Sequence, residues 1–237
     1  KGLAAALGGD PDRIVSGEAL ALGWLGTRID EEMAVYPTIV RIAHAIIAEG
    51  LSERAITIGV TTPEDLTWWL REKVASLKLD TWFHPSVNVQ RPNQKTFAIE
   101  TMAASEARPI QPGDFLHVDF GITYLGLNTD TQHHAYVLKP GETDAPAGLR
   151  AGLAAANKVQ DALLGAFATG RSGNEVLAIA RRTARAEGLT PSIYSHPLGY
   201  HGHGAGPWIG AWDNQAGVPG AGDAPIAAKT AWSIELN

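Results

Sequence analysis

The chain has 237 residues, of which 45% are hydrophobic, enough to build one large globular domain or two small ones. Its net charge of −6, with both signs interspersed, gives no basic surface for nucleic acid or for an anionic membrane. The absence of cysteine excludes disulfides, thiolate metal ligands and a cysteine nucleophile.

The N-terminal residues carry no complete targeting signal. No apolar run approaches the ~18 residues of a membrane-spanning helix, and the apolar stretch at residues 1–7 is too short for a secretory signal. Because the first residue is Lys1 rather than methionine, removal of an upstream segment stays open. A cytoplasmic location and a periplasmic or secreted one are therefore both compatible with the sequence.

Two helices are predicted in the first third of the chain. Residues 30–49 show apolar side chains at steps of three and four, typical of an amphipathic helix, and Gly50 is well placed to end it. A second helix begins with Thr62 as N-cap, Pro63 in the first turn and Asp65 completing a capping box. We expect it to bury Leu66, Trp69, Leu70 and Leu77. An extended stretch at residues 81–89 follows.

A β-hairpin that carries two aspartates is predicted next. Apolar and β-branched residues lie on both sides of a turn at Leu125-Gly126, so the two arms should pair antiparallel. With the turn centred between Tyr124 and Leu125, Asp119 faces Asp130. Opposite residues on one face have Cβ atoms ~5 Å apart, and carboxylates that close repel each other unless a cation lies between them or one is protonated. A divalent metal is therefore expected here.

The second half of the chain repeats the order helix, helix, strand. Apolar residues define a long helix from Leu149 to Phe167, and Ser172 caps another helix that ends at Gly188. An extended stretch at residues 192–195 and a Gly/Pro-rich stretch at residues 196–225 precede a final strand at residues 230–236. The repeated order suggests two similar halves around a pseudo-twofold axis.

Two further segments carry candidate functional residues. His196, His201 and His203 lie among glycines, which let the backbone approach a ligand closely. This segment suits metal or substrate binding, and by itself it is equally typical of a flexible loop with solvated histidines. Glu235 interrupts the final apolar strand, and strand alternation leaves it either solvent-facing or pocket-facing.

Taken in order, these motifs resemble the pita-bread metallopeptidases: methionine aminopeptidase, aminopeptidase P, prolidase and the metal-free relative creatinase. The resemblance rests on Asp-x10-Asp in a hairpin, His-x2-Gly-x3-His, and a strand with Ser-Ile-Glu, and it covers roughly residues 27–237. It implies an α+β fold with two pseudo-symmetric α/β halves around an antiparallel sheet. Residues 1–237 would form a single, C-terminally incomplete catalytic domain, in which residues 1–26 would be the remnant of an upstream segment.

The resemblance also implies roles for individual residues. The metal ligands would be Asp119, Asp130, His196 and Glu235. Asp130 would bridge two ions, and His203 would bind the scissile carbonyl and stabilise the tetrahedral intermediate. An alternative register makes His203 the ligand, as in a Gly-His-Gly motif, but the second histidine of the motif is then replaced by Gly210. We therefore prefer His196.

The sequence departs from the family pattern at two places. The family's second glutamate, which bridges both metals, would follow Glu235 by some tens of residues, and the sequence ends at Asn237. The family also has a substrate-contacting histidine upstream of the first aspartate, where this chain reads Thr101-Met102-Ala103.

Two histidines are candidates to replace the missing one. His84 would have to loop back toward the site, whereas strand alternation places His117 on the same face as Asp119. An ordinary hydrogen-bonded core histidine is the commoner reading for His117. His201 and Trp208 are further candidates for substrate contacts.

The implied ligand set determines the expected chemistry. Carboxylates with one imidazole and no sulfur favour Mn²⁺, with Co²⁺, Fe²⁺ or Zn²⁺ also compatible. Two ions ~3.5–4 Å apart would lower the pKa of a bridging water from ~15.7 toward ~7, and the resulting hydroxide would attack a peptide carbonyl with Glu235 as proton shuttle. By family analogy the reaction is removal of the N-terminal residue of Xaa-Pro peptides. Without the second glutamate, we expect at most one weakly bound ion.

Two other functions stay open. A metal-free hydrolase of the creatinase type would use the same cleft on a small amidino or amide substrate, and a non-catalytic pita-bread module would bind peptides without cleaving them. Retention of both aspartates argues against each, because such relatives lose ligands. The expected partner is a peptide substrate, a homodimer is allowed, and neither nucleic acid nor membrane is expected.

Overall fold

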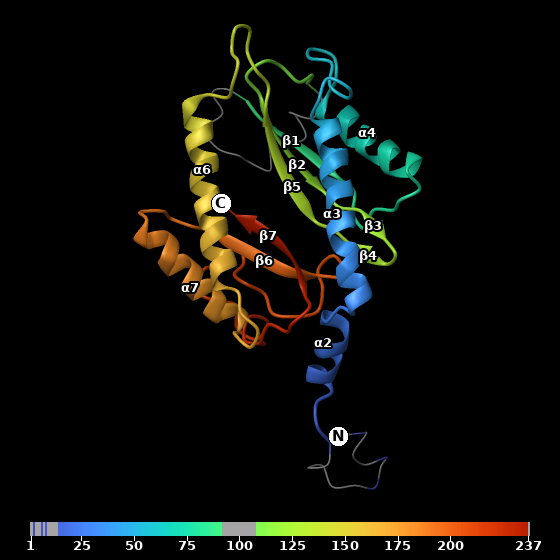
Figure 1. Ribbon diagram of the computed structural model, residues 1–237, viewed down its shortest axis with the longest axis vertical. Coiled ribbons are helices and arrows are strands. Elements are labelled where there is room, and N and C mark those ends of the chain that lie inside the picture. Colours follow the sequence, from blue (N-terminus) through green and yellow to red (C-terminus); the bar gives the residue numbers. More distant parts are fainter. Residues whose placement is uncertain (1, 3–5, 7, 9–13, 92–107, 237) are drawn as a thin grey trace.

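The computed structural model describes residues 2, 6, 8, 14–91 and 108–236. Its helices are α2 (Glu18–Gly26), α3 (Asp30–Gly50), α4 (Pro63–Ser76), α6 (Ala147–Ala166) and α7 (Gly173–Ala186). Its strands are β1 (Ser86–Gln90), β2 (Phe115–Phe120), β3 (Thr123–Tyr124), β4 (Leu127–Asn128), β5 (Thr131–Tyr136), β6 (Ile193–Leu198) and β7 (Ala231–Leu236). Two halves, each with two helices and an antiparallel sheet, lie beside one another (Figure 1).

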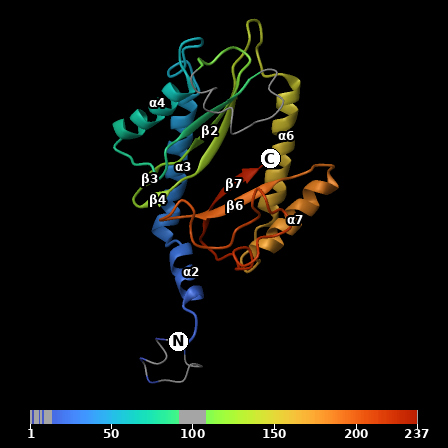
Figure 2. The same ribbon diagram turned by 180° about the vertical axis from the view of Figure 1, so that it is seen from behind.

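In the first half, α3 and α4 cover one face of the sheet β1-β2-β5, as the front and back views both show (Figures 1 and 2). The predicted capping box of α4 is confirmed, because Thr62 Oγ1 accepts from the Asp65 backbone N–H at 3.1 Å and Asp65 Oδ2 accepts from the Thr62 backbone N–H at 2.9 Å. The predicted burial of Leu77 is wrong. Leu77 follows the last helical turn as the C-cap and is 47% exposed.

The two-residue turn of the predicted hairpin is confirmed, but its register is not. Leu125 and Gly126 have φ angles of 53° and 76°, the left-handed pair that a type I′ hairpin turn requires. The turn is therefore centred between Leu125 and Gly126, and Asp119 pairs with Gln132 rather than with Asp130. The predicted Asp119–Asp130 pairing is wrong by two positions. Since side chains alternate with a period of two, a slip of two keeps both aspartates on one face.

In the second half, α6 and α7 pack against β6 and β7 around a second apolar core (Figure 1). Ser172 caps α7 as predicted and forms a capping box with Glu175, and Gly188 follows α7 with a φ of 78°, as a helix-ending glycine should. The predicted end of the extended stretch at residue 195 is wrong, because β6 continues through Leu198. Long-range pairing with β7, which local composition does not reveal, extends the strand and places His196 on it.

The two halves meet where the aspartate hairpin approaches the end of β6. Asn128 donates from both its backbone N–H (2.9 Å) and its side-chain Nδ2 (3.1 Å) to the carbonyl oxygen of Gly199. Asp130 follows Asn128 by two residues, so this contact brings it to the second half. The Thr101-Met102-Ala103 segment lies outside the described residues. Within the described ranges, no helix is both long and apolar enough to cross a membrane.

Candidate metal centre

A cavity of about 350 Å³ lies between the two halves. Its walls are Trp82, Phe83, Asp119, Asp130, Tyr194, His203 and Glu235. Asp119 is on β2 and Asp130 precedes β5, whereas Tyr194 and Glu235 are on the paired strands β6 and β7. The structure therefore brings the three predicted carboxylates together at one place, and the glutamate that alternation left undecided faces the pocket.

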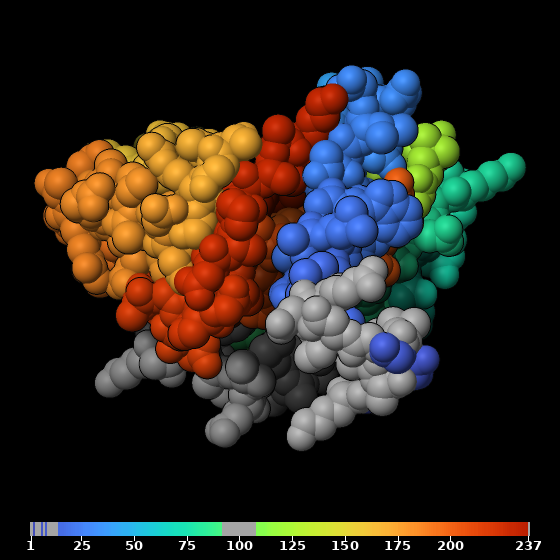
Figure 3. Space-filling model, turned by 90° about the horizontal axis from the view of Figure 1, so that it is seen from below, coloured from blue at the N-terminus to red at the C-terminus, as the bar shows by residue number. Residues whose placement is uncertain are grey.

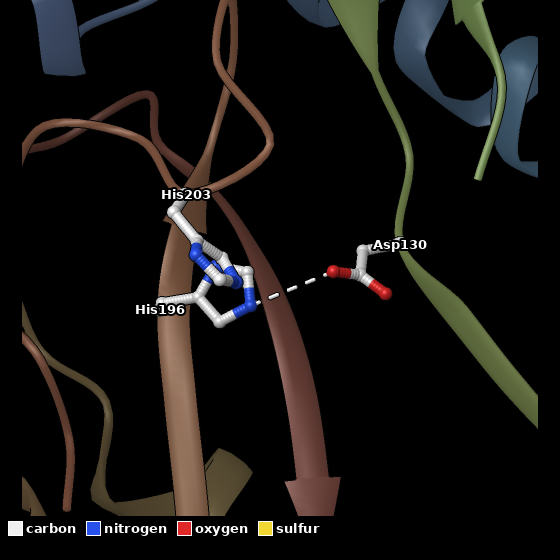
Figure 4. A group of neighbouring side chains, drawn as sticks. All are labelled: Asp130, His196 and His203. Carbon is white, nitrogen blue, oxygen red and sulfur yellow. Dashed lines mark ion pairs between the residues drawn. The ribbon is translucent and has the colours of Figure 1, made fainter. Parts of the chain in front are cut away.

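His196, on β6, lies close to two of these carboxylates. Its Nε2 atom is 3.1 Å from Glu235 Oε1 and 3.6 Å from Asp130 Oδ2. The ring of His203 is 4.3 Å away between centroids, and Figure 4 shows both imidazoles on one side of the cleft with Asp130 opposite. One ligand atom from each of Asp130, His196 and His203 lies within 4.8 Å of the others. Both histidines of the predicted motif thus reach the site, and the geometry allows either to be a ligand.

The carboxylates carry more negative charge than their surroundings neutralise. Burial, with the charges of Asp130 and Glu235, raises the pKa of Asp119 to about 7. Burial lowers the pKa of His196, but its hydrogen bonds to Asp130 and Glu235 outweigh this effect and raise the pKa to about 9. In the metal-free protein, therefore, Asp119 holds a proton near neutral pH and His196 is a cation.

Two carboxylate oxygens show that a cation fits this site. Asp119 Oδ1 and Asp130 Oδ1 are buried and have no hydrogen-bond partner within the described part of the chain. Above its pKa of about 7, Asp119 is ionised and its oxygens can only accept, and a buried acceptor without a donor is unfavourable. Carboxylate oxygens and imidazole nitrogens without sulfur suit a divalent ion of the Mn²⁺, Co²⁺, Fe²⁺ or Zn²⁺ group. The donor set therefore fits a bound metal, whose identity the geometry does not select.

The remaining predicted residues lie at different distances from the cavity. His203 lines it, and burial together with the charge of His196 lowers the pKa of His203. His117 is on the same sheet face as Asp119 but is not one of the lining residues. Its Nε2 lies 3.3 Å from Gln132 Oε1, and its ring is 5.0 Å from that of His134. His117 therefore lies beside the cavity, and its predicted role stays a prediction.

Three proposed substrate-contacting residues lie outside the cavity lining. The His84 side chain is exposed, and its Nδ1 lies 3.1 Å from Arg71 Nη1. The His201 side chain is exposed, and Trp208 packs its ring 5.7 Å from that of Tyr194. Their roles in substrate binding stay predictions.

Sequence reasoning missed the aromatic walls of the cavity. Tyr194 precedes His196 by two residues on β6, so strand alternation would have placed both on one face once β6 was known to reach His196. Burial, with the nearby charges of Glu235 and Asp130, raises the pKa of Tyr194 to about 12, so its phenol stays protonated. Trp82 and Phe83 precede the His-Pro pair at residues 84–85, and no local pattern marks them.

Three solved structures illustrate what the fold is similar to. X-Pro aminopeptidase from Thermotoga maritima is 16% identical, with a TM-score of 0.62 over 92% of this chain and 61% of that one. Dipeptidase PepE from Mycobacterium ulcerans is 21% identical, with a TM-score of 0.64 over 98% of this chain and 57% of that one. Methionine aminopeptidase from Thermotoga maritima is 17% identical, with a TM-score of 0.52 over 87% of this chain and 79% of that one.

The likeness covers nearly all of this chain but only part of most of those enzymes. The chain spans about three fifths of the length of the first structures it matches. Among proteins with curated descriptions, none matches the sequence. The model of metallopeptidase family M24 matches residues 38–237. The shared α+β architecture and this match over most of the sequence show that the chain belongs to metallopeptidase family M24 and has the pita-bread fold.

Proposed function

We propose that this chain carries the catalytic site of a metal-dependent peptidase that hydrolyses the N-terminal peptide bond of Xaa-Pro peptides. The observation that carries the proposal is the pair of buried, unpartnered oxygens, Asp119 Oδ1 and Asp130 Oδ1, beside Glu235 and two imidazoles. A buried group of this kind is stable with a cation present and strained without one. Stability of the fold alone gives no reason for three carboxylates to line one cavity.

Four residues would hold the metal: Asp119, Asp130, His196 and Glu235. Bound divalent ions supply Lewis acidity, which polarises a peptide carbonyl and lowers the pKa of water. Asp130 would be the ligand shared by the two halves of the site, because its carboxylate interacts with Asp119 on its own half and lies 3.6 Å from His196 Nε2 on the other. Mn²⁺ is the ion we favour for this carboxylate-rich set.

The protein's own groups would act on the substrate as follows. His203 lines the cavity and is exposed enough to reach a substrate, and its lowered pKa keeps the ring neutral at pH 7. A neutral imidazole still donates one hydrogen bond, which would stabilise negative charge developing on the carbonyl oxygen. Glu235 would accept the proton of the attacking water and deliver it to the leaving nitrogen.

The aromatic walls suit a small apolar residue at the scissile bond. Trp82, Phe83 and Tyr194 line the cavity beside the carboxylates. A proline ring packs well on such rings, and its burial there would exclude water from the reacting carbonyl. The preference for Xaa-Pro peptides is further supported by similar structures named X-Pro aminopeptidase, prolidase and Xaa-Pro dipeptidase. The metal-free creatinase-like alternative leaves the unpartnered oxygens without a donor.

The test is a peptidase assay of the chain, and of the longer protein where one exists, with Mn²⁺ or with excess chelator. Xaa-Pro dipeptides and tripeptides are compared with matched Xaa-Ala peptides. The proposal expects turnover that requires the metal and favours proline at the second position. Turnover that persists after complete chelation would support the metal-free alternative instead. Metal-dependent turnover without a preference for proline would contradict the substrate class but not the metal site.

A further inference from the structure

A buried arginine near the N-terminus contacts the loop that carries His203. Arg28 is only 1% exposed and lies upstream of residues 38–237, which match the family. Its guanidinium carbon is 4.3 Å from the ring centroid of Tyr200. Glu32 completes the cluster: its carboxylate lies 3.9 Å from Arg28 Nε and accepts the Tyr200 hydroxyl hydrogen bond. A full positive charge is thus buried against the residue that opens the sequence Tyr200-His201-Gly202-His203.

Two glycines at this cluster lie so close to their neighbours that a larger side chain would crowd them. A Cβ atom on Gly199 would lie 3.0 Å from Arg28 Cζ, and one on Gly26 would lie 2.8 Å from the carbonyl oxygen of Ala205. The Arg28 backbone N–H also donates to the carbonyl oxygen of Lys229 at 2.8 Å. From below, blue residues near the N-terminus are seen against red residues near the C-terminus (Figure 3). Residues 26–28 are therefore packed against the second half.

His203 depends on such anchors because it is exposed and lies outside any helix or strand. The loop is held at Gly199 by Asn128 and at Gly202 by the close approach of Trp82, where an added Cβ would come within 2.3 Å of the indole. Tyr200 lies between these two points, and its half-exposed ring is held by the Arg28 guanidinium and by the hydrogen bond to Glu32. A planar guanidinium stacks on an aromatic ring in a fixed orientation, which a flexible ammonium does not.

We propose that Arg28 and Tyr200 are positioning residues that fix loop 199–204 so that His203 faces Asp130 and His196. Neither side chain lines the metal cavity, so they act through the loop and not on the substrate. The assignment rests on the proposed function for its catalytic consequence, although the placement of His203 is a property of the chain alone. It also makes residues 26–32, outside the matched region, a necessary part of the site.

The test follows the histidine side chains of the metal-free protein by long-range ¹H–¹⁵N NMR. The variants are Arg28→Met, Tyr200→Leu and Tyr200→Phe, and the control is Arg150→Met, which removes an arginine that is 59% exposed in its side chain and paired with Asp144. We expect the His203 signals to shift or broaden in Arg28→Met and Tyr200→Leu. They should stay in place in Tyr200→Phe, which keeps the ring under the guanidinium, and in the control.

The rings of His44 and His133 serve as an internal reference, because they pack together 4.7 Å apart in the first half. Unchanged His203 signals in folded Arg28→Met and Tyr200→Leu would overturn the proposal, as would equal shifts of His44 and His133. If Arg28→Met does not fold, the comparison of Tyr200→Leu with Tyr200→Phe decides alone.

The same variants connect positioning to turnover. In the metal-loaded protein, Tyr200→Leu should lower kcat by about 10–100-fold, the scale of a small misplacement of a catalytic group, and Tyr200→Phe should restore it. If the unaltered protein has no peptidase activity, the proposed function fails, and the NMR comparison still decides the positioning role. If His203 moves in Tyr200→Leu but turnover matches that of the unaltered protein, Arg28 and Tyr200 position the loop without affecting catalysis, and the catalytic part of the proposal is refuted.

Discussion

Replacing Asp119 with asparagine should stabilise the metal-free protein at neutral and alkaline pH. Folded Asp119 holds its proton up to about pH 7, whereas an unfolded aspartate loses it near 3.8. Between these values the folded protein binds more protons, so its free energy of unfolding falls as the pH rises through this window. An asparagine has the same shape but does not titrate, so its free energy of unfolding does not fall in this way.

The size of the change in the free energy of unfolding follows from the shift in the pKa of Asp119. At 1.36 kcal/mol per pKa unit, a rise from 3.8 to about 7 corresponds to about 4 kcal/mol at pH 8. Because Asp119 retains some contact with solvent, we expect about 2–4 kcal/mol for Asp119→Asn at pH 8 and less than about 1 kcal/mol at pH 4. Asp144→Asn, at a side chain that is 62% exposed, is the control and should show little dependence on pH.

Urea unfolding of both variants and the unaltered protein, in chelator at pH 4 and pH 8, measures these differences. Saturating Mn²⁺ should reverse the order at pH 8, because only the carboxylate gains from the ion. If Asp119→Asn were less stable than the unaltered metal-free protein at pH 8, the negative charge at this position would be favourable without a cation, and the reasoning from unpartnered carboxylates would be refuted.

Asp130→Asn should lose metal and activity together, because an amide is a poor metal ligand, whereas the control Asp144→Asn should keep both. Metal analysis beside the peptide assay checks this, and metal retained by Asp130→Asn would contradict it. His203→Ala should lower kcat by roughly 10²–10³-fold with metal content unchanged. If His203→Ala loses metal and His196→Ala keeps it, the two histidines exchange roles. Metal affinity should rise between pH 6 and pH 9, because His196 must give up a proton that it holds to about pH 9; calorimetric titration across this range checks it, and a flat profile would contradict it.

Sequence patterns predicted the elements of this fold better than their registers. The apolar periodicities and the capping residues Thr62 and Ser172 give α3, α4, α6 and α7, because these signals act within one or two turns of chain. The hairpin turn was predicted from Gly126, but the same turn residues allow two neighbouring centres. Only the pairing of β2 with β5 selects the register that places Asp119 opposite Gln132.

The sequence indicated which residues form the candidate site, but not the contacts that place them. Asp119, Asp130, His196 and Glu235 come together as the ordered motifs implied, although His196 lies on a strand and not in the glycine-rich loop. The contacts that place the site join residues far apart in the chain, such as Arg28 with Tyr200, and no local pattern encodes them. Tertiary packing alone decides these contacts.

The central claim is that this cavity binds a divalent metal through its carboxylates. The direct measurement is an anomalous-difference map, collected at the manganese absorption edge, from crystals grown with Mn²⁺. We predict the strongest peak within coordination distance of Asp119, Asp130 and His196. A cavity without a peak at millimolar Mn²⁺, with full occupancy of manganese elsewhere on the protein, would contradict it.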